Sequence, residues 1–208
     1  MNNFLQQGLT KYLETTELSK IKNTKILIAG AGGVGSNAAM LLVRCGFEKI
    51  TIIDYDELEP SNLNRQFFFN EQVGTLKVCG LKENLVKINH QATITIIKER
   101  LTVDNVNNLI KNQDIILEAF DDIIAKKIIV EACHLLAKHI IAVSGIAGIG
   151  NSDKIVIRKI NNRFYMVGDF ESDINLALPP LAPKVMIAAA KQVDIVLELV
   201  IGNKEIVR

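Results

Sequence analysis

The sequence lacks tryptophan and contains only three cysteines and three histidines. The cysteines are Cys45, Cys79 and Cys133, and no Cys-x-x-Cys pair occurs. A sparse, odd number of cysteines is typical of a reducing compartment and argues against a disulfide-linked fold. Since all three lie in expected helices beside apolar residues, we interpret them as buried, inert thiols. The histidines show no metal-ligand spacing with each other or with the cysteines, so we expect structural roles for them.

Neither an excess of charge of one sign nor a long apolar run is present. The sequence has 24 Lys and Arg against 23 Asp and Glu, a net charge of +1. This balance provides no global field for nucleic acid, so we expect no nucleic-acid partner, although a local patch is still compatible with it. The longest apolar run, Ile140–Gly150, is shorter than the about 18 residues of a membrane span. The first residues are polar and amphipathic and lack a signal-peptide core. We therefore expect a cytoplasmic protein without a membrane partner.

A βαβ pattern typical of nucleotide-binding proteins occupies residues 25–54. The apolar run Lys25–Ala29 precedes the glycine-rich turn Gly30–Ser36, an apolar helix and a second run that ends in Asp54. Glycine lets the backbone approach a phosphate, and a helix N-terminus offers it free N–H groups and partial positive charge. Asp54 follows Gly30 by 24 residues, near the about 20 expected for an acid that binds ribose hydroxyls. A tight strand–helix corner without a ligand is the alternative.

The segment 54–66 is dense in groups that bind phosphate, ribose or metal. The planar guanidinium of Arg65 suits two phosphate oxygens, and Asn62 can donate amide hydrogens to a phosphate or leaving group. Lys77, eleven residues after Gln66, adds a mobile point charge. A solvated loop with Ser61 or Asn62 as the cap of a following helix is the alternative interpretation.

The motif GxGGxGS, followed by DxDxxExSNLNRQ and then a lysine, resembles the adenylating domain of ubiquitin-activating-type enzymes. That superfamily includes MoeB and ThiF, which activate sulfur-carrier proteins. The resemblance extends over residues 21–199. The short chain and the stretches GDFES and LAPKV make it most similar to compact members of the ThiF family, which act in thiamine biosynthesis.

The resemblance implies an ATP-dependent adenylyltransferase. ATP would lie along the glycine turn with its ribose at Asp54. The C-terminal Gly-Gly carboxylate of a small ubiquitin-like, ThiS-like sulfur carrier would be joined to AMP with release of pyrophosphate. The implied catalytic residues are Asn62, Arg65, Lys77 and Asp121. The implied nucleotide-binding residues are Gly30, Gly32, Gly33, Gly35, Asp54, Asp56, Ser61, Asn62, Arg65, Gln66 and Lys77.

Asp121 and Asp122 follow the apolar run 114–119, at the end of a strand where ligands of open α/β sheets bind. Members of the family have an Asp that helps to hold Mg²⁺, usually followed by Asn, so Asp121 matches and Asp122 departs. We assign Asp121 to Mg²⁺, because this ion takes few protein carboxylates and completes its shell with phosphate oxygens. For Asp122 we favour an N-cap of the next helix.

Two further departures concern the N-terminus and zinc. In relatives, an N-terminal Arg reaches the ATP of the neighbouring subunit of a homodimer. Here no Arg precedes Arg44, and Lys11 is the nearest basic candidate, without the bidentate fork. Relatives often carry two Cys-x-x-Cys pairs that bind zinc. This chain has neither pair, so we predict ATP and Mg²⁺ but no zinc.

The expected fold is α/β and Rossmann-like: a mostly parallel sheet, helices on both faces, and an antiparallel hairpin extension near the C-terminus. We expect one domain over 1–208, made of a helical arm (1–24), a nucleotide-binding core (25–150), and a hairpin, crossover loop and C-terminal helix (151–208). Strands are expected at 25–29, 49–54, 92–97, 114–119 and 140–144, and a hairpin at 153–167. Helices are expected at 34–45, 74–89, 103–111, 123–138 and 184–200.

Three alternative functions stay open. The chain could adenylate another acid: a MoaD-like carrier of molybdopterin synthesis, a tRNA-nucleoside acid or a peptide acid. It could be a dehydrogenase, although such an enzyme has little use for Asn62, Arg65 and Lys77 together. It could also bind a carrier protein without turning over ATP, as the missing N-terminal Arg would allow.

Overall fold

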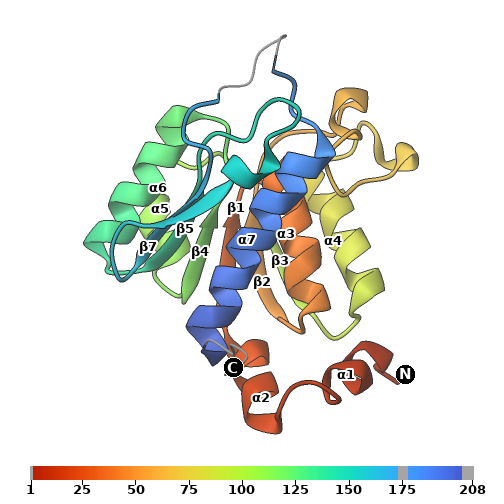
Figure 1. The fold of residues 1–208 in the computed structure, drawn as a ribbon. Helices are drawn as coiled ribbons and strands as arrows, with labels where there is room; N and C mark the ends of the chain where they lie inside the picture. Colours follow the sequence, from red (N-terminus) through yellow and green to blue (C-terminus); the bar gives the residue numbers. More distant parts are fainter. Residues whose placement is uncertain (1, 173–177, 203–208) are drawn as a thin grey trace.

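The structure is a computed structural model that describes residues 2–172 and 178–202 (Figure 1). A seven-stranded sheet has the order β3-β2-β1-β4-β5-β7-β6. The strands are β1 (Lys25–Ala29), β2 (Lys49–Ile53), β3 (Thr93–Ile97), β4 (Ile115–Glu118), β5 (His139–Val143), β6 (Val156–Lys159) and β7 (Phe164–Gly168). All neighbouring strands are parallel except β6 and β7. The predicted fold class is confirmed.

Helices cover both faces of the sheet (Figure 1). They are α1 (Phe4–Leu9), α2 (Thr15–Asn23), α3 (Gly33–Arg44), α4 (Lys77–Ile88), α5 (Val106–Ile110), α6 (Ile123–Leu135) and α7 (Ala182–Ile201). α3, α4 and α7 lie on one face, and α5 and α6 on the other. Residues of β1 alternate between two cores: Ile26 and Ile28 pack with α3 and α7, while Leu27 and Ala29 pack with α6. This alternation explains the continuous apolar runs, because both faces of each central strand are buried.

The parallel strands place their carboxyl ends at one edge of the sheet. The glycine turn (30–36) follows β1, the polar segment 54–66, called the polar block below, follows β2, and Asp121 follows β4. β1 lies between β2 and β4, so these three segments emerge side by side. The order of strands therefore gathers the predicted site residues at one edge.

The N-terminal arm is helical, as expected, but consists of two helices with a break between Leu9 and Thr15. Glu14 ends the break as the cap of α2, where its backbone N–H donates to a side-chain oxygen of Glu17 at 2.9 Å. α1 has no buried residue, and Tyr12 in the break is exposed. A local capping box thus overrides the helical spacing of apolar residues.

The C-terminal part matches most of its prediction. β6 and β7 form the expected antiparallel hairpin at the edge, but β7 itself runs parallel to β5. The predicted last helix is present as α7. Residues 173–177 of the predicted crossover loop lie outside the described residues. No helix in the described part of the chain has the length and apolar character needed to cross a membrane.

Candidate nucleotide-binding site

Two glycines are required by close contacts within the glycine turn, and a third has free space beside it. Gly30 has φ 105°, and a Cβ there would lie 2.8 Å from the carbonyl oxygen of Ala119. A Cβ on Gly35 would collide with the carbonyl oxygen of Gly30. At Gly32, in contrast, the nearest atom to such a Cβ is Nε2 of Gln66, 3.9 Å away. Gly30 and Gly35 thus permit the turn, whereas Gly32 leaves free space at the N-terminus of α3.

The Asp54 carboxylate joins the glycine turn to the polar block. One oxygen accepts from the N–H of Ala31 at 2.7 Å and the other from the N–H of Asp56 at 2.8 Å. Burial raises the pKa of Asp54, and these two hydrogen bonds act in the opposite direction. Asp54 therefore stabilises the turn itself, while its role at a ribose stays a prediction.

Two side chains of α3 attach the polar block to the turn. The Asn37 amide donates to the carbonyl oxygens of Gly33 at 2.7 Å and Arg65 at 2.8 Å. The hydroxyl of Ser36 accepts from the N–H of Phe67 at 3.0 Å. The sequence analysis missed Asn37, although a buried asparagine in an otherwise apolar helix is a signal for such a role.

The Arg65 side chain lies beside the glycine turn. It donates to the carbonyl oxygen of Ser61 at 2.9 Å and to the side-chain oxygen of Asn64 at 2.8 Å. Its Cγ would be 3.5 Å from a Cβ on Gly33. Burial lowers the pKa of Arg65, and the charge of Asp121 opposes this shift. The structure thus brings Arg65, the glycine turn and Asp121 into one region.

Gln66 adds an unpaired polar atom to this region. The side chain is 8% exposed, and its Oε1 is buried without a hydrogen-bond partner among the described residues. Its amide nitrogen is the nearest atom to the open position at Gly32. Of the two polar atoms of this side chain, only the nitrogen lies within 4 Å of the open position, and the oxygen is closed to solvent.

Asn62 and Ser61 form local hydrogen bonds within the polar block. Oδ1 of Asn62 accepts from the N–H of Glu59 at 3.1 Å, in the capping arrangement of a short 3₁₀ helix, Pro60–Asn62. Its Nδ2 lies 3.5 Å from the hydroxyl of Ser61, which donates to a carboxylate oxygen of Glu59 at 3.3 Å. Neither Ser61 nor Asn62 caps a following helix, because Asn62 ends a short 3₁₀ helix whose N-cap is Glu59. The predicted contacts of both residues with a nucleotide stay predictions.

Lys77 does not carry a mobile point charge, contrary to the sequence-based expectation. Its side chain is 10% exposed, and Nζ lies 2.7 Å from a carboxylate oxygen of Asp56. The backbone N–H of Lys77 also donates to the carbonyl oxygen of Asp56, at 2.9 Å. The start of α4 and the polar block are therefore held together by an ion pair that is half-exposed on the Asp56 side.

Asp121 and Asp122 differ in their surroundings. Asp122 caps α6, as predicted, because its carboxylate accepts from the N–H of Ile124 at 2.8 Å, and it also pairs with Arg100 at 3.0 Å. A hydrogen bond to Arg100 lowers the pKa of Asp122. Asp121 is exposed, and its carboxylate forms no hydrogen bond or ion pair within residues 2–172 and 178–202. It remains available to a cation near Arg65.

A buried ion pair that the sequence analysis missed lies behind Asp121. Glu118 is 1% exposed at the end of β4, and Nζ of Lys126 donates to its oxygens at 2.9 and 3.0 Å. The neighbouring Lys127 differs from Lys126, because it is exposed and lies 3.8 Å from Glu131 on the outer side of α6. An acid at the end of the apolar run 114–119 was the available signal.

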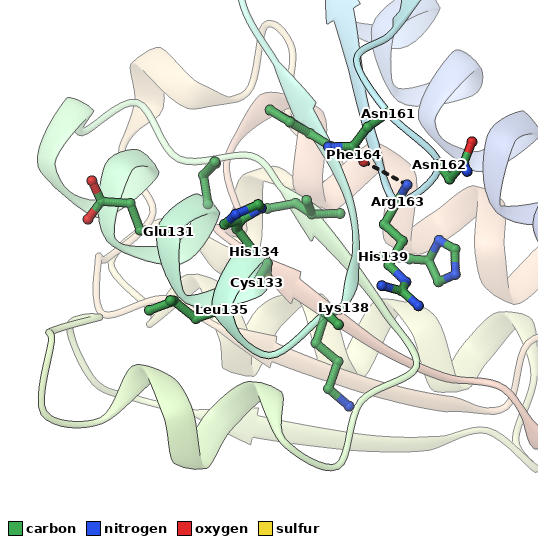
Figure 2. A pocket seen from close by; sticks show the side chains of 13 residues that line it. Glu131, Cys133, His134, Leu135, Lys138, His139, Asn161, Asn162, Arg163 and Phe164 are labelled. Atoms are coloured by element: carbon green, nitrogen blue, oxygen red, sulfur yellow. Dashed lines mark hydrogen bonds between the residues drawn. The ribbon is translucent and has the colours of Figure 1, made fainter.

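A cavity of about 1050 Å³ lies elsewhere, at the amino ends of β5 and β7 (Figure 2). Figure 2 shows Arg163 and His139 side by side there, with Cys133 and His134 on α6. None of the predicted site residues lines this cavity. β1, β4 and β5 run parallel, and the glycine turn follows the carboxyl end of β1. The cavity and the predicted nucleotide site therefore lie at opposite ends of the strands.

The chain, including the fold and the glycine motif, matches a known protein family. Residues 6–205 match the ThiF family. The chain belongs to the ThiF family. Among curated relatives, it is 35% identical over 128 residues to "Adenylyltransferase and sulfurtransferase MOCS3" of Aedes aegypti, covering 61% of this chain and 29% of that protein. It is 36% identical over 132 residues to "Adenylyltransferase and sulfurtransferase UBA4" of Candida albicans, covering 63% and 30%.

Solved structures similar to this ThiF-family chain support the fold. The E. coli tRNA N6-threonylcarbamoyladenosine dehydratase TcdA, in complex with ATP, gives a TM-score of 0.84 at 22% identity and covers 93% of this chain and 92% of that chain. E. coli MccB with ATP gives 0.71 at 21% identity and covers 96% and 64%. The chain spans about three tenths of the length of the curated relatives it matches.

Proposed function

We propose that this ThiF-family chain adenylates a carboxylate: it joins an acid to AMP at the expense of ATP and releases pyrophosphate. The observation that carries the proposal is the open position at Gly32. It lies at the N-terminus of the 12-residue helix α3, and the nearest atom to it is the amide nitrogen of Gln66, 3.9 Å away. Family membership, and curated relatives named as adenylyltransferases, support the same reaction.

The residues at the turn fit the phosphates of ATP. A Cβ at Gly32 would occupy the space that a phosphate needs, and the N-terminal N–H groups of α3 favour an anion there. The aliphatic part of the Arg65 side chain lies beside Gly33, so its guanidinium can supply positive charge near the turn. ATP in our proposal lies along residues 30–36, with its ribose toward Asp54.

Asp121 fits a Mg²⁺ site that is completed by the nucleotide. Its carboxylate is exposed, lacks a partner among the described residues and interacts electrostatically with Arg65. A single carboxylate with phosphate oxygens and water is a usual ligand set for this ion. Bound Mg²⁺ would offset the charge on the phosphate oxygens.

The protein residues then act by positioning and electrostatics. The carboxylate of the acid attacks the α-phosphorus, the bond from that phosphorus to pyrophosphate breaks, and the electron pair leaves with pyrophosphate. No general base is needed, because a carboxylate is already ionised. Arg65 and Lys77 stabilise negative charge on the phosphate oxygens. Asp56 accepts one of the three N–H donors of Lys77, so the other two remain for the substrate.

For the acid we propose the C-terminal Gly-Gly carboxylate of a ThiS-like sulfur carrier. A thin glycine tail is what can enter a crevice at the carboxyl ends of the strands. The relatives named as sulfurtransferases favour a carrier, whereas the fold shared with a tRNA-modifying dehydratase favours a tRNA-nucleoside acid as second candidate. A homodimer in the cytoplasm, with Lys11 in place of the N-terminal Arg of relatives, completes the proposal.

The test is ATP–pyrophosphate exchange with Mg²⁺ and a carrier protein that ends in Gly-Gly. We expect exchange only when the carrier is present, and loss of exchange when its last glycine is removed. The truncated carrier is the matched control, because its globular part is unchanged. Exchange with tRNA alone would replace the carrier by the second candidate. Absence of exchange with every acid tested, despite ATP binding, would contradict adenylation.

A further inference from the structure

Two buried charges lie directly behind the predicted site, although the proposed reaction does not use them. Glu118 is the last residue of β4, and Lys126 lies in α6. Besides both oxygens of Glu118, Nζ of Lys126 contacts the carbonyl oxygen of Val143 at 3.0 Å. All three N–H donors of the ammonium can therefore be satisfied inside the protein.

The contacts of Glu118 lead to Asp121. An oxygen of Glu118 accepts from the backbone N–H of Phe120 at 2.7 Å, which fixes the peptide immediately before the segment that carries Asp121. On the other side, Asp122 accepts from the N–H of Ile124 and fixes the first turn of α6. The position of Asp121 is thus determined by bonds that its neighbours make.

The pair also connects four elements. Lys126 joins α6 to the end of β4 and, through Val143, to the end of β5. The amide of Gln192 in α7 donates to the carbonyl oxygens of Glu118 at 3.1 Å and Ile141 at 2.8 Å. A displacement of the pair would therefore move the junction from which Asp121 extends.

The charges themselves are expected to add little to stability. Desolvation of a buried ion pair offsets its Coulomb attraction, and replacement by apolar residues of similar volume is often neutral or stabilising. Hydrogen bonds to charged groups are, however, short and directional, so the pair restricts geometry more than it stabilises the fold.

We propose that Glu118 and Lys126 are positioning residues that hold Asp121 where it meets the metal–nucleotide complex. This inference rests on the proposed function, because it assumes that Asp121 interacts with Mg²⁺ bound to ATP. Neither residue touches ATP; both act through the Phe120 peptide and the first turn of α6.

The test compares ATP affinity in Mg²⁺ with ATP affinity in EDTA, measured by calorimetry on the full chain. The double variant Glu118→Met with Lys126→Met removes both charges at similar side-chain volume. We expect it to stay folded and to bind ATP in EDTA within about twofold of wild type, while the gain from Mg²⁺ falls about tenfold or more, as misplaced groups do. Asp121→Asn is the reference for complete loss of the gain.

Two control variants are expected to leave the gain from Mg²⁺ unchanged. Lys126→Arg keeps a positive charge and hydrogen-bond donors opposite Glu118, so we expect it to retain the gain from Mg²⁺. Lys127→Met removes the neighbouring, exposed charge of the same helix and should leave the gain unchanged. If the double variant does not fold, Glu118→Leu with Lys126→Leu replaces it, since this pair of substitutions also removes both charges and the acceptor of the Phe120 N–H.

The outcomes distinguish this inference from the proposed function. A folded double variant of either kind with the wild-type gain from Mg²⁺ overturns the positioning role alone. Wild-type protein that binds no ATP in either condition overturns the proposed function and this inference with it. A reduced gain in the double variant, with wild-type behaviour of Lys127→Met, supports the positioning role.

Discussion

The side-chain amide of Asn37 donates at once to the carbonyl oxygens of Gly33, at 2.7 Å, and of Arg65, at 2.8 Å. One buried residue of α3 therefore ties the glycine turn to the segment that carries the guanidinium. The backbone of Arg65 is thereby fixed relative to the glycine turn before any ligand arrives, and such preorganisation is the condition for electrostatic stabilisation without reorganisation.

Asn37→Ala should lower both stability and adenylation. Two backbone carbonyls would lose their partner, and an unsatisfied buried polar group costs about 1–3 kcal/mol. For a chain of this size that corresponds to about 2–4 °C in Tm per kcal/mol. Thermal unfolding and pyrophosphate exchange measure the two effects. Asn107→Ala, at an exposed position of α5, is the control; equal unfolding midpoints for the two variants would contradict the role of Asn37.

Gly32→Ala and Gly35→Ala should fail in different ways. Gly32 has φ −78° and no atom nearer than 3.9 Å to a new Cβ, so the alanine variant is expected to fold with near wild-type stability. Its methyl group would occupy the space proposed for a phosphate, and ATP affinity should fall about tenfold or more. Gly35→Ala would place Cβ against the carbonyl oxygen of Gly30 and disrupt the turn itself. Calorimetry and thermal unfolding separate these effects, and wild-type ATP affinity in a folded Gly32→Ala variant would refute the assignment of the turn.

Arg65→Ala should reduce pyrophosphate exchange by about 10²-fold or more, the loss expected for one preorganised charge contact. Arg65→Lys keeps the charge without the planar fork and should have an intermediate rate. Arg158→Ala removes an arginine of the edge strand β6 and is the control. A wild-type exchange rate in Arg65→Ala would remove this residue from the catalytic set.

Lys77→Met should lower exchange by about 10²-fold, because it removes a fixed positive charge at similar volume. Asp56→Asn leaves the ammonium in place with a neutral acceptor, so we expect a smaller loss, below about tenfold. The ratio of the two rates is the measurement. If Asp56→Asn were as damaging as Lys77→Met, the ion pair and not the ammonium would be the functional unit.

We expect the free energy of unfolding to fall when the pH is lowered mildly, because of the protonation of His139. Burial lowers the pKa of His139, and the positive charge of Arg163 acts in the same direction. His139 therefore binds a proton more readily in the unfolded chain than in the folded one. Its contribution to stability is present above the ordinary pKa of about 6.5 and is lost as the pH falls toward the pKa of the folded state. Urea unfolding between pH 8 and pH 5 measures this slope. His139→Gln should flatten it, with His134→Gln as control, and an unchanged slope in His139→Gln would contradict the prediction.

Local patterns in the sequence were sufficient for the sheet and the turn. Apolar runs marked the buried strands, and the glycine spacing placed the start of α3 within one residue of Val34. The helical arm was less predictable, since the capping box at Glu14 and Glu17 interrupts a pattern that apolar spacing alone continues. Helix ends depend on such local hydrogen bonds, which compete with periodicity.

The site residues also show what local sequence patterns can and cannot predict. The sequence by itself determined which groups would gather at the carboxyl ends of β1, β2 and β4, because strand order and parallel direction follow from βαβ connections. It did not determine that Lys77 is buried against Asp56, or that Lys126 faces Glu118 while Lys127 faces water. Those differences depend on which side of a helix meets the sheet and on which acid lies within reach, so only the tertiary structure decided them.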